Sequence, residues 1–246
     1  MPAAKRLFIG LMSGTSLDGI DCVIVDLAGD TPALITADCH ALPDNLRHDF
    51  LTLCADKQAP LAELGRLDIE LGRCFAEAAI KTLAAAGVVA QEIEAIGSHG
   101  QTVFHQPNSA APFSLQLGDP NTIAERTGIT TIADFRRRDM AASGQGAPLA
   151  PLLHQHCCAS QNKNRAIVNI GGIANITLLL ANGARVAFDT GPGNVLMDHW
   201  VARHKSAHFD KNGEWAKGGS VDTALLAELM SEPYLALAAP KSTGRE

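Results

Sequence analysis

The sequence lacks a surplus of basic residues, a long apolar run and most aromatic side chains. Among its 246 residues, 20 lysines and arginines stand against 26 aspartates and glutamates, and the formal net charge is -6. That balance argues against a general nucleic-acid surface. No stretch is long enough to cross a bilayer, and the apolar run after Lys5 and Arg6 breaks at Gly10, unlike a signal peptide. We therefore expect a soluble cytoplasmic protein that binds neither nucleic acid nor a membrane.

Other absences limit the chemistry. The six cysteines show neither the C-x-x-C spacing of a zinc site nor the density of a disulfide scaffold. His204 and His208 are four residues apart, which suits a metal, but no third ligand is close in the sequence and we favour surface residues. The first glycine-rich segment lacks a Gly-Lys-Ser/Thr ending, which excludes a P-loop kinase on pattern.

The chain opens with a small, polar segment between two apolar runs, residues 7–11 and 20–27. This pattern predicts a hairpin whose tip presents backbone amides to an anion such as phosphate. Strand, glycine-bearing turn and strand recur at 166–180, in pattern but not in residue identity. The repeat predicts two related domains, 1–164 and 165–246, each with a phosphate-facing hairpin.

Polar side chains follow several predicted strands, where ligands usually sit in α/β folds. Residues 98–102 (Ser-His-Gly-Gln-Thr) and His105 follow a strand at 93–97, although a half-buried neutral histidine is an equally ordinary explanation. Asp119 opens a helix, and we favour a capping role for it. Residues 134–139 carry two acids and three arginines, which fit either a surface salt-bridge patch or a site for an anionic or hydroxylated ligand.

Asp189 follows a predicted strand at 185–188 and precedes glycines and a helix. An aspartate in that position can act as a base beside a phosphate site. The alternative is a capping or turn residue, but Thr190, Gly191 and Asn194 already supply that chemistry. We therefore favour the catalytic reading.

Several motifs together resemble the 1,6-anhydro-N-acetylmuramic acid kinase family of the sugar kinase, Hsp70 and actin superfamily. In unbroken order they are GLMSGTSLDGID at 10–21, SHGQTVFH at 98–105, QLGD at 116–119, DFR at 134–136, GQGAPL at 144–149, NIGGIANIT at 169–177, FDTGPGN at 188–194 and KSTGRE at 241–246. The resemblance implies an α/β protein with the actin-like ATPase (ribonuclease H-like) fold. It also implies an ATP-dependent enzyme of cell-wall sugar recycling that opens the anhydro ring with water and phosphorylates O6.

The same resemblance implies roles for individual residues. Asp189 would be the general base that activates water, and Asp18 or Asp21 would be an outer-shell partner of Mg²⁺. The residues implied for the phosphates of ATP are Gly14, Thr15, Ser16, Leu17, Asp18, Gly19, Ile20, Asp21, Gly171, Gly172 and Asn175. Those implied for the sugar are His99, Thr102, Gln116, Asp134 and Arg136, with Arg136 suited to the lactyl carboxylate.

Two departures from the family pattern stand out. Ser143 replaces a usual glycine, so a positive φ at that position would strain the backbone. Family members also continue well beyond residue 246, and we expect a C-terminally truncated chain with a complete first domain, a partial second domain and weak or absent turnover. The alternative function is an inactive or sugar-binding fragment that lacks the adenosine site. An actin-like or chaperone-like ATPase is less well supported, because no peptide-binding domain is visible, and a homodimer is left open.

Overall fold

The computed structural model describes residues 4–14, 17–107, 109–241 and 243. The chain divides into two compact units, Met1–Ala147 and Pro148–Glu246. No helix among the described residues is long and apolar enough to cross a membrane.

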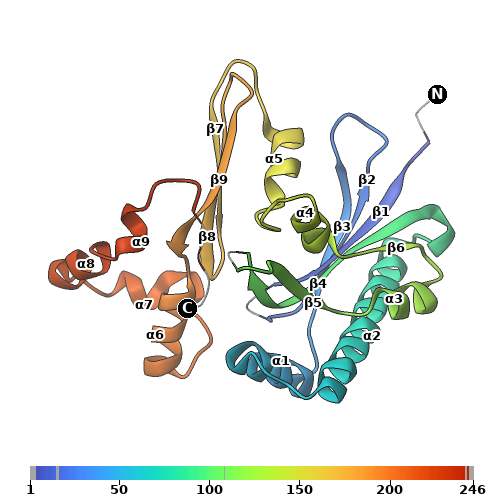
Figure 1. Cartoon of the computed structure of the whole chain (residues 1–246), viewed down its shortest axis with the longest axis horizontal. Coiled ribbons are helices and arrows are strands. Elements are labelled where there is room, and N and C mark those ends of the chain that lie inside the picture. The colour runs from blue at the N-terminus through green and yellow to red at the C-terminus, as the bar shows by residue number, and fades with distance from the viewer. Residues whose placement is uncertain (1–3, 15–16, 108, 242, 244–246) are drawn as a thin grey trace. The chain divides into compact units, whose positions relative to one another are not determined.

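The first unit is a mixed α/β layer structure, as predicted for the α/β class (Figure 1). Its sheet has the strand order β3-β2-β1-β4-β5, and β6 pairs with β4 beside this path. Its elements are β1 (Leu7–Ser13), β2 (Ile20–Asp26), β3 (Ala33–His40), α1 (Asp44–Asp56), α2 (Leu61–Ala86), a 3-10 turn (Ala90–Glu92), β4 (Ile93–Gln106), β5 (Phe113–Leu117), α3 (Pro120–Thr127), β6 (Thr131–Ile132) and α4 (Phe135–Ala141).

The predicted opening hairpin is confirmed. Strands β1 and β2 pair antiparallel with Leu7 opposite Asp26 and Ser13 opposite Ile20, and β1 also pairs in parallel with β4. Alternate residues of β1, among them Ile9 and Leu11, are buried, because successive side chains of a strand point to opposite faces. The hairpin therefore forms the centre of the sheet and brings its tip to one end of it.

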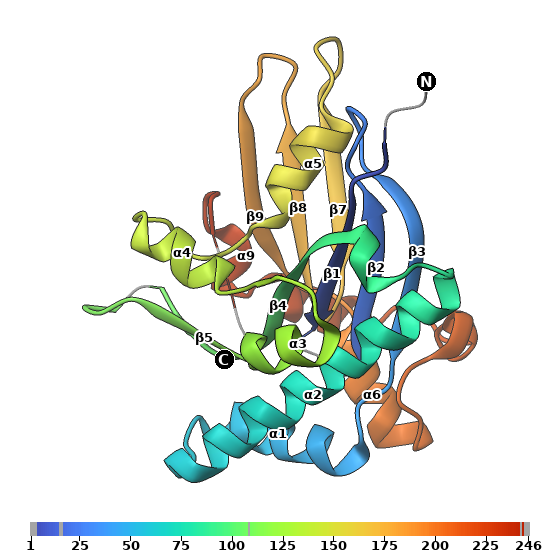
Figure 2. The same cartoon turned by 90° about the vertical axis from the view of Figure 1, so that its right-hand side faces the viewer.

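Helix α2 covers one face of this sheet (Figure 2). Its apolar residues recur at helical spacing, and Leu67, Leu71 and Phe75 are buried against the strands. The helix ends at Gly87, which adopts a left-handed conformation (φ 66°) that closes the last turn. The apolar stripe of α2 is therefore part of the core.

Strand β4 differs from the prediction. It was expected to end at Gly97 but runs on to Gln106, so Ser98, His99 and Thr102 lie within the strand and not after it. The far half of β4 pairs antiparallel with β5, which supplies a partner that the sequence pattern does not reveal. Strand β6 is short and pairs with β4 only at Thr131 and Ile132.

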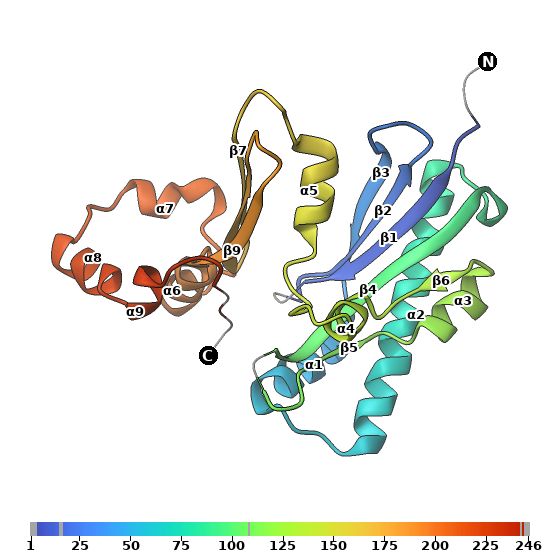
Figure 3. The same ribbon diagram turned by 45° about the horizontal axis from the view of Figure 1, so that its top comes forward.

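The second unit contains an antiparallel sheet of order β7-β8-β9 and several helices (Figure 3). Its elements are α5 (Ala150–Cys158), β7 (Arg165–Ile170), β8 (Ile173–Leu179), β9 (Arg185–Pro192), α6 (Val195–Lys205), a 3-10 turn (Lys211–Gly213), α7 (Glu214–Lys217), α8 (Thr223–Met230) and α9 (Pro233–Ala236). The second predicted hairpin is thus present as β7 and β8, with Gly171 and Gly172 at its turn.

One strand boundary in this unit differs from expectation. Strand β9 extends through Pro192, so Asp189 lies inside the strand and opposite Asn175 instead of following the strand. Helix α5 packs on β8, where the ring Nδ1 of His154 lies 2.9 Å from Oγ1 of Thr177. This packing places α5 in the second compact unit, ahead of the predicted domain boundary at 164/165, which stays a prediction.

A glycine substitution tests the contact between β4 and β5. Gly100 has φ 72°, and a Cβ there would lie 2.5 Å from the carbonyl oxygen of Leu117. We expect Gly100→Ala to lower the free energy of unfolding by about 3 kcal/mol, about 1 from the left-handed backbone and about 2 from the clash. Urea unfolding of the purified chain measures this change.

Gly128→Ala is the matched control, because Gly128 has φ 69° but no atom within 4 Å of its Cβ position. We expect it to lose about 1 kcal/mol. Equal losses in the two variants would show that the contact between the added Cβ at position 100 and Leu117 costs no stability.

Candidate functional site

The first unit contains a pocket of about 400 Å³ into which several elements direct polar side chains. Volumes of this size are typical of small-molecule sites. Its polar lining residues come from α2, β4, β5 and the start of α4: Asp68, Ser98, His99, Gln116, Asp134 and Arg137. Three of the residues predicted for the sugar, His99, Gln116 and Asp134, therefore meet in one pocket.

Two buried polar atoms at this pocket have no hydrogen-bond partner among the described residues. They are Oγ of Ser98, whose residue is 1% exposed, and Oε1 of Gln116. The amide nitrogen of Gln116 is engaged, since it donates to Oγ1 of Thr102 at 3.1 Å and to Oγ of Ser114 at 2.6 Å. An unpaired buried polar atom is costly, so a hydroxyl-bearing ligand that bonds both atoms would recover that energy.

His99 is held as a neutral ring in one tautomer. Its Nδ1 donates to the carbonyl oxygen of Gly100 at 2.9 Å, and its Nε2 accepts from Nε of Arg136 at 2.8 Å. Burial lowers the pKa of His99 below its ordinary value, and the neighbouring Arg136 charge lowers the pKa further. A protonated ring would place its Nε2–H against the N–H of Arg136, so the geometry favours the neutral form.

Arg136 joins His99 to the glycine-rich segment that follows α4. Besides His99, it donates through Nη1 to the carbonyl oxygen of Gly146 at 3.0 Å, and the amide of Gly146 donates to Oδ2 of Asp139 at 2.8 Å. Ser143, in this segment, has φ 71°. This is the positive φ that would strain the backbone of a serine at that position. The role predicted for Arg136 with a lactyl carboxylate stays a prediction.

Asp68 is a site residue that sequence reasoning missed. It lies in the middle of α2, where its Oδ1 accepts from the amide of Gly118 at 2.7 Å and its carbonyl oxygen accepts from the amide of Asp119 at 3.1 Å. Burial raises the pKa of the Asp68 carboxyl, and the nearby charges of Asp119 and Asp134 act in the same direction, against the Gly118 hydrogen bond. The one sequence signal for Asp68 was its place as a single aspartate among the leucines on the apolar side of α2.

The other acids divide between structural and open roles. Asp119 caps α3 as predicted, accepting from the amides of Asn121 and Thr122 at 3.3 and 2.7 Å. Asp134 forms an exposed ion pair with Arg137 at 3.4 Å, so the surface salt bridge exists, and both residues also line the pocket. The two alternatives for residues 134–139 are therefore compatible.

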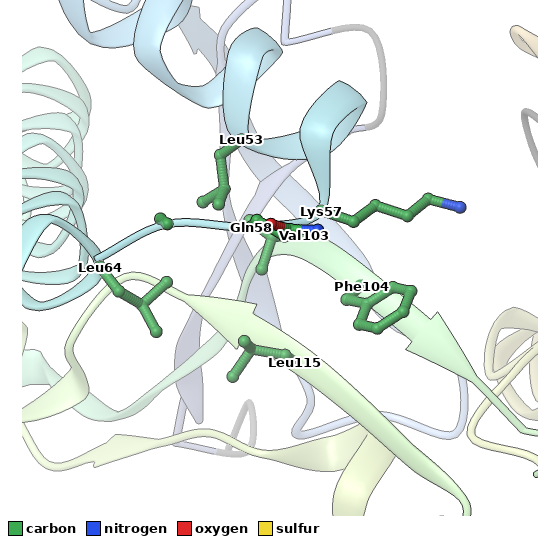
Figure 4. A pocket seen from close by; sticks show the side chains of 8 residues that line it. Leu53, Lys57, Gln58, Leu64, Val103, Phe104 and Leu115 are labelled. Atoms are coloured by element: carbon green, nitrogen blue, oxygen red, sulfur yellow. The ribbon is translucent and has the colours of Figure 1, made fainter. Parts of the chain in front are cut away.

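A second pocket, of about 380 Å³, adjoins the first and shares Leu64 and Leu115 with it. Figure 4 shows Leu53, Leu64 and Leu115 around its centre, with Lys57 extending away from them beside Phe104. Lys57 and Gln58 are its polar lining side chains. The groups able to hydrogen-bond a sugar are thus concentrated in the first pocket.

The tip between β1 and β2 is partly described. Thr15 and Ser16 lie outside the described residues, whereas the amide of Leu17 donates to the carbonyl oxygen of Gly14 at 3.1 Å. Leu17 has φ 56° and a buried side chain. Gly19 packs so closely on β3 that a Cβ would lie 2.8 Å from the carbonyl oxygen of His40. Leu17 and Gly19 therefore anchor the described end of the tip.

The second hairpin is bonded to the segment that follows β9. The amides of Gly193 and Asn194 donate to the carbonyl oxygens of Gly172 and Gly171, each at 2.8 Å. A Cβ at Gly193 would lie 2.1 Å from the carbonyl oxygen of Gly171, so this contact requires glycine. It fixes the hairpin turn to the strand that carries Asp189.

The proposed magnesium partners, Asp18 and Asp21, are both exposed. Among the described residues, no group of three or more His, Cys, Asp or Glu side chains is placed to hold a metal by itself. Helix α6 ends at Lys205, so His208 lies beyond the helix while His204 stacks on Trp200 with ring centroids 4.2 Å apart. The histidine pair therefore does not present two ligands on one helix face.

The neutral state of His99 has a measurable consequence. Because its pKa is lowered in the folded protein, the unfolded chain binds more protons near pH 6, and stability present above the unfolded pKa is lost as pH falls. We expect ring NMR signals of His99 to titrate below the ordinary value of about 6.5.

The matching stability effect is measured by urea unfolding at about pH 7.5 and about pH 5.5. His99→Asn keeps a donor near the Nδ1 position but does not titrate, so it should show a smaller loss between the two pH values. A wild-type ring that titrates at or above its ordinary value would contradict the assigned tautomer.

Comparisons with known proteins agree with this organisation. The family model described as anhydro-N-acetylmuramic acid kinase matches residues 6–246. A curated anhydro-N-acetylmuramic acid kinase of Shewanella sp. (strain MR-4) is 54% identical over 243 residues, which cover 98% of this chain and 66% of the relative. One from Pasteurella multocida (strain Pm70) is 49% identical over 246 residues, which cover 100% of this chain and 65% of the relative.

The chain thus spans about two thirds of the length of these relatives, 65% and 66%. Among solved structures, an exopolyphosphatase-like protein is 14% identical to this chain, with a TM-score of 0.41. The match covers 94% of this chain and 62% of that protein. This similarity is too weak to bear on fold or function. The family-model match and the curated relatives suffice: the chain belongs to the anhydro-N-acetylmuramic acid kinase family.

Proposed function

We propose that this chain carries the sugar-binding pocket and catalytic aspartate of an ATP-dependent anhydro-N-acetylmuramic acid kinase. The observation that carries the proposal is the pocket of the first unit, where buried Ser98 and Gln116 have unpaired oxygens beside neutral His99. These groups match the hydroxyl and amide groups of an amino sugar. The proposed substrate is taken from the names of the curated relatives, which are anhydro-N-acetylmuramic acid kinases.

In the proposed reaction, Asp189 takes a proton from water. The water oxygen bonds to the anomeric carbon of 1,6-anhydro-N-acetylmuramic acid while the bond from that carbon to O6 breaks. O6 then attacks the γ-phosphorus of ATP, and ADP leaves, which gives N-acetylmuramic acid 6-phosphate. A carboxylate suits the first step because it is ionised at neutral pH and can accept a proton.

The two hairpins are the proposed sites for the phosphates of ATP. The candidates remain Gly14 to Asp21 at the first turn and Gly171, Gly172 and Asn175 at the second. Asp18 and Asp21 fit an outer-shell role for Mg²⁺, because this ion keeps several waters and commonly uses one or two carboxylates with substrate phosphates. Magnesium would neutralise charge during phosphoryl transfer.

We infer that the chain has the fold of the actin-like ATPases, which is a ribonuclease H-like fold. Support comes from the sheet of the first unit, in which β1 pairs antiparallel with β2 and in parallel with β4. The domain division 1–164 and 165–246, a cytoplasmic location, a homodimer and the absence of nucleic-acid binding stay predictions. The second candidate function, a sugar-binding fragment without turnover, is kept because the chain spans about two thirds of its relatives.

One assay separates the two functions. The chain is incubated with ATP, Mg²⁺ and 1,6-anhydro-N-acetylmuramic acid, and the 6-phosphate is measured by mass spectrometry while calorimetry measures sugar binding. Product supports the kinase, and Asp189→Asn should then bind the sugar but lose a factor of about 10² to 10⁴ in turnover. Binding without product supports the sugar-binding fragment.

A serine variant tests the pocket itself. Ser98→Ala removes the buried hydroxyl, and we expect sugar binding to weaken about tenfold, the value of one hydrogen bond. Ser220→Ala is the control, since Ser220 is exposed and lies in the second unit. Unchanged affinity of the Ser98 variant would show that the sugar does not bind in this pocket.

A further inference from the structure

The segment from Tyr234 to Thr243 returns to β9 and contacts Asp189 at three different atoms. The hydroxyl of Tyr234 donates to the carbonyl oxygen of Asp189 at 2.7 Å, and the amide of Asp189 donates to the carbonyl oxygen of Lys241 at 3.0 Å. The amide of Thr243 donates to Oδ2 of the Asp189 side chain at 3.2 Å. The main chain and the carboxylate are therefore both held by one short stretch.

Lys241 closes this stretch into a loop. Its ammonium donates to the carbonyl oxygens of Tyr234 at 2.9 Å and Leu235 at 3.1 Å, and it lies 4.7 Å from the centroid of the Tyr234 ring. Two of its three N–H donors are thus engaged within the loop. In this arrangement Lys241 and Thr243 have a local role at Asp189, which the sequence did not reveal.

Helix α9 also fits directly against β9 beside the aspartate. Gly191 has φ 135°, and a Cβ there would lie 3.2 Å from Cδ2 of Leu235. On the other side of β9, Oγ1 of Thr190 donates to the carbonyl oxygen of Ala174 at 3.1 Å. Asp189 is therefore bordered by β8 on one side and by the loop from Tyr234 to Lys241 on the other.

We propose that Tyr234 and Lys241 are positioning residues, which hold the strand at Asp189 and bring the Thr243 amide onto the Asp189 carboxylate so that it keeps one orientation. The proposal rests on the role of Asp189 given above. Neither residue touches the reacting atoms. Their effect is to restrict the carboxylate, because a base must be fixed in reach of the proton that it removes.

Amide hydrogen exchange tests the loop without any ligand. In Tyr234→Phe and in Lys241→Met, the amides of Asp189 and Thr243 should exchange about tenfold faster, as expected for the loss of one hydrogen bond. Lys217→Met is the control, because Lys217 is exposed on α7 and should leave both amides unchanged. Unaltered exchange at Asp189 and Thr243 in both variants overturns the proposal.

Tyr234 gives an independent signal, because it is the only tyrosine in the sequence. Burial raises the pKa of its phenol above the ordinary value, and the charge of Asp189 raises the pKa further. An absorbance titration of tyrosinate should therefore have a lower midpoint in Asp189→Asn than in the wild-type chain, with circular dichroism as the check on folding. An identical midpoint in the two folded proteins counts against the contact.

Turnover separates this proposal from the proposed function. Tyr234→Phe should lower kcat about tenfold and leave KM unchanged, since the lost contact acts on the base and not on the sugar. If the wild-type chain shows no turnover, the proposed kinase activity is wrong, whereas the exchange and titration results still test the contacts between the loop and Asp189. A Tyr234→Phe chain with full kcat would overturn the positioning role even if the amides exchanged faster.

Discussion

Close packing at three glycines brings together elements that line the pocket of the first unit. A Cβ at Gly72 would lie 2.9 Å from the carbonyl oxygen of Asp119, one at Gly100 would lie 2.5 Å from that of Leu117, and one at Gly118 would lie 2.9 Å from the Phe75 ring. Helix α2, strand β4 and the end of β5 can therefore come nearly into backbone contact. Because they do, polar side chains from three distant parts of the chain line one pocket.

The chemistry of that pocket differs from the chemistry expected at the hairpins. Asp68 and Asp134 are acids, His99 is neutral, and the Arg136 guanidinium bonds His99 and the carbonyl oxygen of Gly146. With Arg137 also in the lining and paired with Asp134, the pocket offers both donors and acceptors, which suits a ligand rich in hydroxyl and amide groups. The proposed phosphate sites are instead the two glycine-bearing turns, so the proposal gives sugar and phosphate recognition to different elements.

Features set by local sequence were predicted well. The hairpin of β1 and β2, the hairpin of β7 and β8 and the cap formed by Asp119 each depend on residues only a few positions apart. The length of β4 was missed because its partner β5 pairs with a segment interrupted by Gly100. Asp68 was missed for a similar reason, since its partner Gly118 is 50 residues away and no local pattern records that contact. Of the residues predicted for the sugar, His99, Gln116 and Asp134 line the pocket, whereas Thr102 and Arg136 are not among its lining residues.

The second unit holds Asp189 by a different physical means from the core of the first unit. Few of its described side chains are fully buried, Leu179 and Val201 among them, and the apolar residues of α8 are about half exposed or more. Packing against a large core therefore cannot be what fixes the carboxylate. Hydrogen bonds are directional, so the contacts from Tyr234, Lys241 and Thr243 can orient one side chain with little buried area around it. One short loop thus contributes directly to the orientation of the proposed base, and disturbing that loop should affect the carboxylate before it affects the fold.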